Sequence, residues 1–380
     1  MATQPARPGI AAMGVTLALS TLCENPGRRT GLSTFFPEFV GAARRIYPDV
    51  AWLVFAGRDT PWSDDDPGVA VCRDFSSNEH PLRRLAADHL RVAPEARRRG
   101  AAALVTVGFM PLRSAGLPVA MQVFAFGDRA ATDPIRRAYR NWALSRGLRD
   151  ASLVIANSAW TRSRLGPAGA AALVSPEGLQ HARFRPDGPR GLAGLPPRYL
   201  LWASNFYPYK RADRALAAYA TLSEERRAQF PLVLAGGEWG EGRSRAQAKA
   251  RSLGIERDVR FLGWVEDADL PALCRGAQAY VLSTALESFG RGALETMACG
   301  CPGVLQDLPV LREVAGEAAL YVDYDDVPAA GASLEAICSD GALRSRLAEA
   351  GLARAGTFSF ERLARERVGA LLERLGRGAS

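Results

Sequence analysis

The chain has 380 residues and a formal net charge of +8, and 48% of its residues are hydrophobic and 23% charged. This composition is ordinary for a globular protein of two or three domains. No stretch approaches the roughly 18 apolar residues of a membrane-spanning helix, and no Cys-x-x-Cys pair supports a zinc site. Three histidines leave little material for histidine-based catalysis, and the dispersal of the arginines among acidic residues argues against nucleic-acid binding.

Lysine is rare in this chain. Only Lys210 and Lys249 are lysines, and the other 46 basic residues are arginines. A genomic bias towards G and C explains the excess of arginine, so each lysine is worth locating individually.

In the first half of the chain, apolar runs typical of buried strands alternate with segments of helical spacing. The clearest helix is 32–46, where apolar residues recur every three or four positions from Leu32 to Ala43. Such alternation predicts parallel sheets with helices on both faces. The expected strands are 15–22, 50–56, 101–107, 119–126 and 151–157, and a second expected helix is 135–146.

A segment rich in Gly, Pro and Ala, 166–197, interrupts this alternation and predicts a connection between two domains. The alternation then restarts and ends in an amphipathic helix at 360–375. We therefore expect two consecutive α/β sandwiches with a cleft at the carboxyl ends of their strands. The further expected elements are the strands 199–203, 232–235, 259–262 and 279–282 and the helices 211–222, 243–253, 269–275 and 291–299.

The most informative stretch is 283–295, which reads STALESFGRGALE. A predicted strand ends near Ser283, Glu287 follows in a loop with glycines, and Glu295 lies in the early turns of the next helix. Glycines before a helix let backbone N–H groups approach an anion, and the helix dipole favours negative charge there. Because carboxylates repel phosphate, we expect Glu287 and Glu295 to accept hydrogen bonds from hydroxyl groups on either side of a bound anion.

This stretch resembles family 4 of the retaining glycosyltransferases, also described as glycosyl transferases group 1. The family signature is the Glu-x7-Glu spacing, here Glu287 to Glu295, and the residues around it up to Pro302 match as well. The resemblance implies the GT-B fold: two Rossmann-like, doubly wound parallel-sheet domains facing a cleft, with a C-terminal helix that crosses back to the N-domain. It is extended by the segments 30–32, 136–140, 154–158, 176–186, 201–210, 259–265, 308–320 and 357–361.

The resemblance also implies a domain organisation. Residues 14–187 would form an N-terminal Rossmann-like acceptor domain, 188–359 a C-terminal Rossmann-like nucleotide-sugar domain, and 360–380 a terminal helix packing on the N-domain. Residues 1–13 lack the layout of a signal peptide and are expected to form a disordered leader. With its scattered cysteines, the chain is expected to be cytoplasmic, with reduced thiols.

The activity that the resemblance implies is transfer of a sugar from a nucleotide-diphosphate sugar to a hydroxyl acceptor, with retention and without a metal ion or another cofactor. Negative charge grows on the β-phosphate as the nucleotide leaves, so a fixed cation and N–H dipoles stabilise the transition state selectively. Lys210 would supply the cation and Glu287 would hold the donor sugar, which makes these two the expected catalytic residues. The expected donor-binding residues are Gly31, Asn205, Arg211, Gly263, Trp264, Val265, Glu287, Ser288, Phe289, Gly290, Arg291 and Glu295.

Within this set, the resemblance assigns individual roles. The backbone amides at the start of the 291–299 helix would face the diphosphate, Glu295 would hold the ribose, and the turn Gly263–Val265 would meet the base. Gly31 belongs to the N-terminal glycine loop that closes over the donor.

Two positions depart from the family pattern. The arginine that the family carries five residues before the diphosphate lysine is Asn205 here, so either Arg211 or Arg291 compensates or Lys210 binds the diphosphate largely alone. The His-Asp pair that many members carry in the N-domain corresponds to Phe124 and Ala125. Acceptor-side chemistry therefore lacks its usual histidine, and Asp128 is the nearest polar substitute.

Two histidines are further candidates for the acceptor side. His80 and His89 lie in a loop and helix of the N-domain. They either recognise the acceptor or serve as a cap at the start of that helix and a surface histidine.

Several functions remain open. Apart from a transferase, the chain could be a non-catalytic GT-B partner subunit or another GT-B enzyme, such as a nucleotide-sugar epimerase or a phosphorylase. The expected partners are a nucleotide-sugar donor, GDP-mannose-like by resemblance, and a hydroxyl-bearing acceptor that is either a glycan or lipid-linked intermediate or a small natural product. No nucleic acid and no stable membrane insertion are expected, and the lack of a strongly amphipathic basic helix favours a soluble acceptor.

Overall fold

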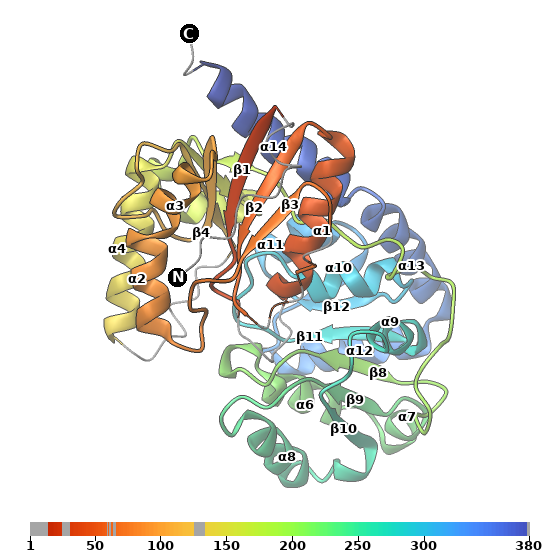
Figure 1. Ribbon diagram of the computed structural model, residues 1–380. Helices are drawn as coiled ribbons and strands as arrows, with labels where there is room; N and C mark the ends of the chain where they lie inside the picture. The colour runs from red at the N-terminus through yellow and green to blue at the C-terminus, as the bar shows by residue number, and fades with distance from the viewer. Residues whose placement is uncertain are drawn as a thin grey trace. The chain divides into compact units, whose positions relative to one another are not determined.

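The chain folds into two compact units, shown in the computed structural model of Figure 1. Unit 1 combines Met1–Gly178 with Phe360–Ser380, and unit 2 comprises Leu179–Ser359. The structure describes residues 14–24, 31–58, 60, 62–63, 66–124 and 134–377. The chain therefore leaves unit 1 once and returns to it with its last helix.

Unit 1 is built on a seven-stranded sheet in the order β3-β2-β1-β4-β5-β6-β7, and its neighbouring strands are parallel. The strand β2 is buried at all six positions, because helices cover both faces of a parallel sheet; this explains its continuous apolar sequence. The strands are β1 (Val15–Ser20), β2 (Val50–Phe55), β3 (Val69–Cys72), β4 (Ala103–Val107), β5 (Val119–Val123), β6 (Leu153–Ala156) and β7 (Leu173–Val174). The helices are α1 (Gly31–Ile46), α2 (Pro81–Leu90), α3 (Val92–Arg98), α4 (Pro134–Asp150), α5 (Ala159–Arg164) and α14 (Phe360–Arg377).

The terminal helix α14 packs on the core of unit 1. The rings of Phe360 and Phe35 lie 5.5 Å apart, and Arg45 pairs with Glu361 at 2.6 Å. Arg367 is 3% exposed and donates a hydrogen bond to the carbonyl of Ser175 at 2.6 Å. The predicted return of the C-terminal helix to the N-terminal unit is confirmed.

Unit 2 is a second doubly wound unit. Its six-stranded parallel sheet has the order β10-β9-β8-β11-β12-β13. The strands are β8 (Leu200–Ala203), β9 (Leu232–Ala235), β10 (Val259–Gly263), β11 (Ala279–Leu282), β12 (Gly303–Gln306) and β13 (Ala319–Val322). The helices are α6 (Ala212–Ala220), α7 (Glu224–Gln229), α8 (Gly242–Ser252), α9 (Leu270–Gly276), α10 (Arg291–Ala298), α11 (Pro309–Ala315), α12 (Val327–Ser339) and α13 (Gly341–Ala355).

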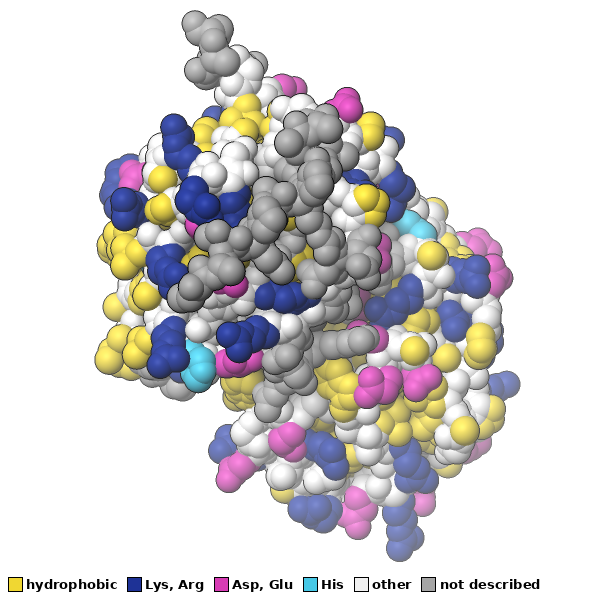
Figure 2. Space-filling view, viewed as in Figure 1, with side chains coloured by type: hydrophobic (Ala, Val, Ile, Leu, Met, Phe, Trp, Pro, Cys, Tyr) yellow, Lys and Arg dark blue, Asp and Glu magenta, His cyan; other side chains and the backbone are white. Residues whose placement is uncertain are grey.

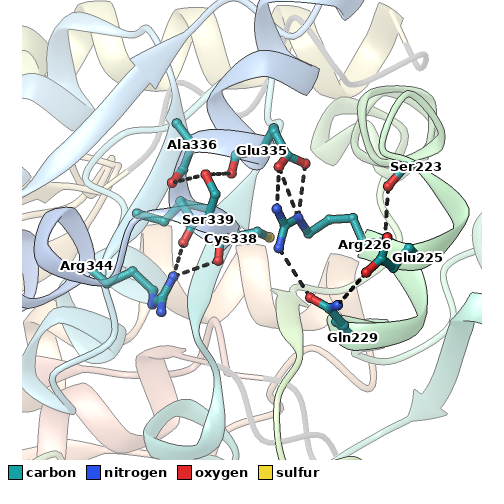
Figure 3. A network of polar contacts seen from close by, with 10 residues as sticks. Ser223, Glu225, Arg226, Gln229, Glu335, Ala336, Cys338, Ser339 and Arg344 are labelled. Atoms are coloured by element: carbon teal, nitrogen blue, oxygen red, sulfur yellow. Dashed lines mark hydrogen bonds and ion pairs between the residues drawn. The ribbon is translucent and has the colours of Figure 1, made fainter.

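A polar network ties α7 to α12 in unit 2 (Figure 3). Arg226 donates from Nε and Nη2 to Oε1 of Glu335, at 3.0 and 2.7 Å. Ser223 caps α7 by accepting from the backbone amide of Arg226, and Arg344 donates to the carbonyl of Cys338 near the end of α12. These contacts fix the helices that cover the sheet.

The predicted elements agree closely with the observed ones. The strands β9 and β11 have the predicted bounds, and the other predicted strands differ by a few residues at their ends. The strands β3, β7, β12 and β13 were not predicted. The strand predicted at 15–22 ends at Ser20, because the chain turns there and the amide of Glu24 donates to the carbonyl of Thr21. The helix predicted at 135–146 continues to Asp150. Within the described residues, no helix is both long and apolar enough to cross a membrane.

Candidate functional site

Two loops meet at the carboxyl ends of β8 and β11 in unit 2. These strands are neighbours, and the strand order runs away from them in opposite directions, to β9 and β10 on one side and to β12 and β13 on the other. Open parallel sheets bind ligands at such a switch point, because the two loops diverge and leave a crevice. The loop after β8 carries Lys210, and the loop after β11 carries Glu287.

Lys210 and Glu287 form an ion pair between Nζ and Oε1. Their side chains are only 15% and 13% exposed, and the ammonium also lies 5.4 Å from the ring centre of Tyr209. The structure thus brings together the two residues expected to be catalytic. Because the pair is largely shielded from water, an anionic ligand would compete with Glu287 for the ammonium.

A pair of buried hydroxyl groups holds the Lys210 loop in place. Ser283 Oγ donates to the carbonyls of Lys210 and Arg211, at 3.2 and 2.8 Å. Thr284 Oγ1 lies 3.3 Å from the carbonyl oxygen of Tyr209. The same carbonyl accepts a hydrogen bond from the backbone amide of Ala285 at 2.7 Å. Both hydroxyl residues are fully buried. This clamp was not predicted from the sequence, although two small hydroxyl residues directly after a strand at a switch point were a usable signal.

Arg211 has a strained backbone and a paired side chain. Its φ of 53° is left-handed, which costs a residue other than glycine about 1 kcal/mol. The hydrogen bond from Ser283 to its carbonyl helps to maintain this conformation. The guanidinium of Arg211 pairs with Asp325, which also pairs with Arg214 at 3.0 Å. To replace the missing phosphate arginine, Arg211 would have to leave this carboxylate.

Asn205, at the position of that missing arginine, joins two loops. Its Oδ1 accepts a hydrogen bond from the amide of Gly237 at 2.9 Å, so the loops after β8 and β9 are tied together. The side-chain oxygen of Asn205 therefore serves the backbone in this structure.

The start of α10 is shaped by two glycines. Gly290 has a φ of +95°, and a Cβ there would lie 2.6 Å from Leu311. A Cβ at Gly292 would lie 2.6 Å from the hydroxyl of Tyr280. Phe289 is buried against the ring of Phe358. Only the backbone amide of Phe289 is therefore available to a ligand, whereas its ring belongs to the core.

The second glutamate of the motif lies on α10 and is also paired. Glu295 accepts from Nη2 of Arg291 at 3.3 Å, and its side chain is 16% exposed. Both glutamates of the Glu-x7-Glu motif therefore face a cation, and both remain partly open to solvent. Ser288, between them, is half-buried.

A row of aromatic side chains leads away from Lys210. The rings of Tyr209 and Tyr207 stack 5.3 Å apart, and the ring of Trp239 lies 4.4 Å from that of Tyr207. Burial, together with the charge of Glu287, raises the pKa of Tyr209 to about 12. Exposed aromatic faces at strand ends suit planar bases and the apolar faces of sugars.

The turn after β10 lies beside these loops. Gly263 has a φ of +75° and ends β10, Trp264 is exposed and Val265 half-buried. The amide of Gly236, after β9, donates to the carbonyl of Gly263 at 2.7 Å. The three residues expected at the base therefore stand at the carboxyl edge of the same sheet as Lys210.

The acceptor-side expectations fall on unit 1. Asp128 and Ala125 lie outside the described residues, and Gly31 is the first residue of α1. Phe124 is half-buried, with its ring edge-on to Phe35 at 5.0 Å and 5.6 Å from the guanidinium carbon of Arg367. Phe124 thus packs within the cluster that joins α1 to α14.

His80, before α2, and His89, within it, do not have the cap and surface roles that the sequence left open for them. His80 is at the N-cap position of α2, but its side chain makes no capping hydrogen bond. His89 is 5% exposed and lies 2.7 Å from the hydroxyl of Tyr139, so it is not a surface histidine. Burial, reinforced by Arg84, lowers its pKa. The sequence missed this because α4, which covers His89, lies some fifty residues further along the chain.

A family model matches this chain within unit 2, and curated proteins match about half of the chain. The family model described as glycosyl transferases group 1 matches residues 191–354. The chain is 35% identical over 172 residues to O-antigen chain mannosyltransferase B of Escherichia coli, a match covering 45% of each protein. It is 33% identical over 221 residues to D-inositol 3-phosphate glycosyltransferase of Salinispora arenicola, covering 52% of this chain and 48% of that protein. The chain spans about half the length of these curated relatives.

Solved structures match nearly the whole chain. Sucrose-phosphate synthase of Thermosynechococcus elongatus has a TM-score of 0.78 at 19% identity, covering 96% of this chain and 100% of that one. HepE of Anabaena, in complex with UDP and glucose, has a TM-score of 0.73 at 19% identity, covering 94% and 98%. These likenesses confirm the predicted GT-B fold.

Proposed function

We propose that the chain belongs to glycosyl transferases group 1, whose family model matches residues 191–354, and that it transfers a hexose from a nucleotide-diphosphate sugar to a hydroxyl-bearing acceptor. The observation that carries the proposal is the Lys210–Glu287 pair, which the buried hydroxyls of Ser283 and Thr284 hold at the switch point. The glycine-shaped start of α10 follows Glu287 by only a few residues.

The chemistry of the donor fits this arrangement. As the nucleoside diphosphate leaves, negative charge accumulates on its β-phosphate, and a cation fixed in a shielded site stabilises that charge selectively. Lys210 would provide the cation after exchanging Glu287 for phosphate. The backbone amides at Phe289, Gly290 and Arg291 would provide dipoles, as helix N-termini do for anions.

The remaining donor contacts follow from the same geometry. Glu287, released from Lys210, would accept hydrogen bonds from the donor sugar, and Glu295 from the ribose. The base would lie against the turn Gly263–Val265, with the aromatic row from Tyr209 to Trp239 as a further stacking surface.

A GDP-mannose-like donor is the first to test. The similarity to a mannosyltransferase over 172 residues supports it, as does the resemblance of 287–320 to members with such donors. The alternative is a UDP-sugar, since HepE was solved with UDP and glucose. The similarity to D-inositol 3-phosphate glycosyltransferase supports a polyol-like acceptor hydroxyl.

The proposal includes retention of the anomeric configuration and independence of metal ions and of any other cofactor, both implied by the family. Retention predicts that NMR of the initial product shows the anomeric configuration of the donor. Metal independence predicts that the rate of nucleotide release is unchanged by EDTA and is not raised by added Mg²⁺.

A thermal-shift panel of GDP, UDP and ADP tests the donor site directly. The cognate diphosphate should raise the melting temperature by an amount set by its affinity, and the shift should shrink in Lys210→Ala but not in Lys249→Ala. The proposed donor site would be wrong if Lys210→Ala and Glu287→Ala both released nucleotide from the sugar donor at the wild-type rate.

A non-catalytic GT-B partner subunit is the second candidate. It is favoured by the packing of Phe124 among aromatic rings at the usual histidine position and by the engagement of Asn205 with Gly237. A diphosphate-induced thermal shift without nucleotide release from any sugar donor and acceptor extract would support this candidate over a transferase.

A further inference from the structure

Unit 1 displays a group of exposed hydrophobic side chains. Seven large hydrophobic residues among those described are strongly exposed, and five of them lie in unit 1. Two are on α2 and two on α4, and the fifth is in the loop after β4. Leu82 and Ile135 are 82% and 80% exposed, which is unusual for aliphatic residues of this size. The five are Leu82, Leu90, Leu112, Ile135 and Trp142.

The three elements that carry them are neighbours at one edge of unit 1 (Figure 1). His89 of α2 bonds to Tyr139 of α4 at 2.7 Å, and its ring lies 5.8 Å from that of Trp142. The loop after β4 is tied to α2, because the amide of Arg113 donates to the carbonyl of His89 at 2.9 Å. These contacts hold α2, α4 and the loop after β4 side by side, and we call the surface formed by their exposed side chains the α2–α4 face.

The same face is rich in arginine. Helix α4 contains five arginines and one aspartate, a net charge of +4, which is half of the +8 of the whole chain. Figure 2 shows dark-blue and yellow side chains next to one another at this edge of unit 1. The exposed arginines of these helices, of the loop after β4 and of the residue that follows α2 are Arg83, Arg91, Arg113, Arg136, Arg137, Arg140 and Arg149.

The acidic residues of these two helices do little to offset this charge at the surface. Asp88 is buried, and it accepts hydrogen bonds from Ser20 at 2.7 Å and from Arg84 at 3.3 Å. Asp150 lies at the last position of α4 and pairs with Arg149 at 2.8 Å. The face thus combines exposed apolar side chains with an excess of positive charge.

We propose that the α2–α4 face docks the protein peripherally on an anionic lipid surface. Leucine, isoleucine and tryptophan side chains enter the boundary between headgroups and acyl chains, and arginines around them pair with lipid phosphates. Nucleic acid fits less well, because its backbone offers no partner for exposed aliphatic groups such as Leu82 and Ile135. The docking does not depend on the proposed transfer reaction.

The sequence concealed this face because neither helix carries it alone. The exposed apolar residues are divided between α2 and α4, which are separated by some fifty residues, so no single segment reads as a basic amphipathic helix. Packing through His89 and Tyr139 assembles the two halves. A lipid-linked acceptor is consistent with such a face, in contrast to the soluble acceptor that the sequence favoured.

Co-sedimentation with phosphatidylcholine vesicles, with and without phosphatidylglycerol, tests the proposal on the full chain. We expect binding that requires phosphatidylglycerol and weakens at high salt. Each arginine removed from the surface should lower partitioning about fivefold, so Arg83→Ala and Arg137→Ala should do so singly. The double variant Leu82→Ser, Ile135→Ser should lower it further without loss of thermal stability, because both side chains are exposed.

The matched control is Arg251→Ala, which removes one exposed arginine from α8 in unit 2. Absence of wild-type binding to phosphatidylglycerol vesicles at low salt would overturn the proposal, and so would equal losses in Arg137→Ala and Arg251→Ala. Two further outcomes would also overturn the proposal, because they would assign the face to another partner. One is that RNA displaces the protein from vesicles when RNA and lipid are present at equal charge. The other is that the wild-type protein forms a dimer in solution and the Leu82→Ser, Ile135→Ser variant is a monomer.

Discussion

The switch points of the two sheets place carboxyl groups in opposite environments, one beside a cation and one without a partner. In unit 2, at the ends of β8 and β11, the carboxylate of Glu287 is matched by the ammonium of Lys210 and stays partly exposed. In unit 1, at the end of β1, Glu24 is 2% exposed, and neither carboxylate oxygen has a partner among the described residues. The same topology thus supports a paired, ligand-accessible charge in one unit and a buried carboxyl group in the other.

The difference is visible in the pKa values at the switch point of unit 1. Burial raises the pKa of Glu24 to about 8. Burial also raises the pKa of Asp88 to about 6, although Arg84 and the hydrogen bond from Ser20 lower it. At neutral pH Glu24 is therefore held largely in its neutral form, whereas Asp88 lies beside Arg84 and Glu287 beside Lys210. Topology therefore determines where a site forms, and the partners of each side chain determine what it can do there.

The largest expected effect is on the paired charge of unit 2. Lys210→Ala should lower kcat/KM at least 100-fold, about 3 kcal/mol of transition-state stabilisation. Arg211, the other cation of the loop that Ser283 holds, is paired with Asp325 and would not replace the ammonium. The measurement is nucleotide release from the donor that gives the largest thermal shift. Lys249→Ala, on the helix α8, is the control and should retain wild-type activity. A similar loss of activity in both variants would mean that Lys210 has no specific role in the reaction.

The buried carboxyl of unit 1 should make stability depend on pH. A folded-state pKa raised to about 8 means that the neutral form of Glu24 favours folding below the unfolded-state pKa. This stability is then lost as the pH rises through about 8. We expect the free energy of unfolding to fall by the order of 2 kcal/mol between pH 5 and pH 9. The measurement is chemical denaturation at several pH values.

Glu24→Gln should flatten that dependence, since the amide cannot ionise. Glu317→Gln, at an exposed position of unit 2, controls for the loss of a carboxylate and should leave the slope unchanged. A wild-type stability that does not fall in this range, or a Glu24→Gln profile parallel to it, would show that Glu24 is not a buried neutral carboxyl.

Most of the strands and the charged pair could be predicted from the sequence, but β3, β7, β12 and β13 and the contacts that hold the pair could not. The strands β9 and β11 were predicted at their observed bounds because a strand buried on both faces needs an unbroken apolar run. Lys210 and Glu287 followed from the family resemblance. The clamp by Ser283 did not, because a hydroxyl that bonds to backbone carbonyls of a distant loop leaves no periodic pattern. For the same reason the pairing of His89 with Tyr139 and the α2–α4 face required the fold.

A smaller effect is expected at the clamp. Ser283→Ala removes a hydroxyl whose hydrogen bonds hold the carbonyls of Lys210 and Arg211. Loss of about 1.4 kcal/mol would lower kcat about tenfold and leave the donor KM nearly unchanged, because the positioning matters most in the transition state. Steady-state kinetics at varied donor concentration measures kcat and the donor KM separately.

The role of Ser283 as a positioning residue makes a stricter prediction. In the Lys210→Ala background, Ser283→Ala should have almost no additional effect on kcat, because the group that it positions is gone. Ser333→Ala, which removes an exposed hydroxyl from α12, is the control. Additive losses in the double variant would mean that Ser283 acts on another group.

The smallest effect is expected at the network between α7 and α12 (Figure 3), whose residues make no contact shown there with either switch point. The Arg226 and Glu335 side chains are 24% and 44% exposed, so water and salt screen the pair despite its two-pronged geometry. Arg226→Ala should therefore destabilise the protein by less than about 1 kcal/mol, and less still at high salt, with unchanged kcat and KM. A tenfold loss of activity without loss of stability would show that this helix pair communicates with the Lys210 loop. Charge placement at the strand ends would then not suffice to explain the site.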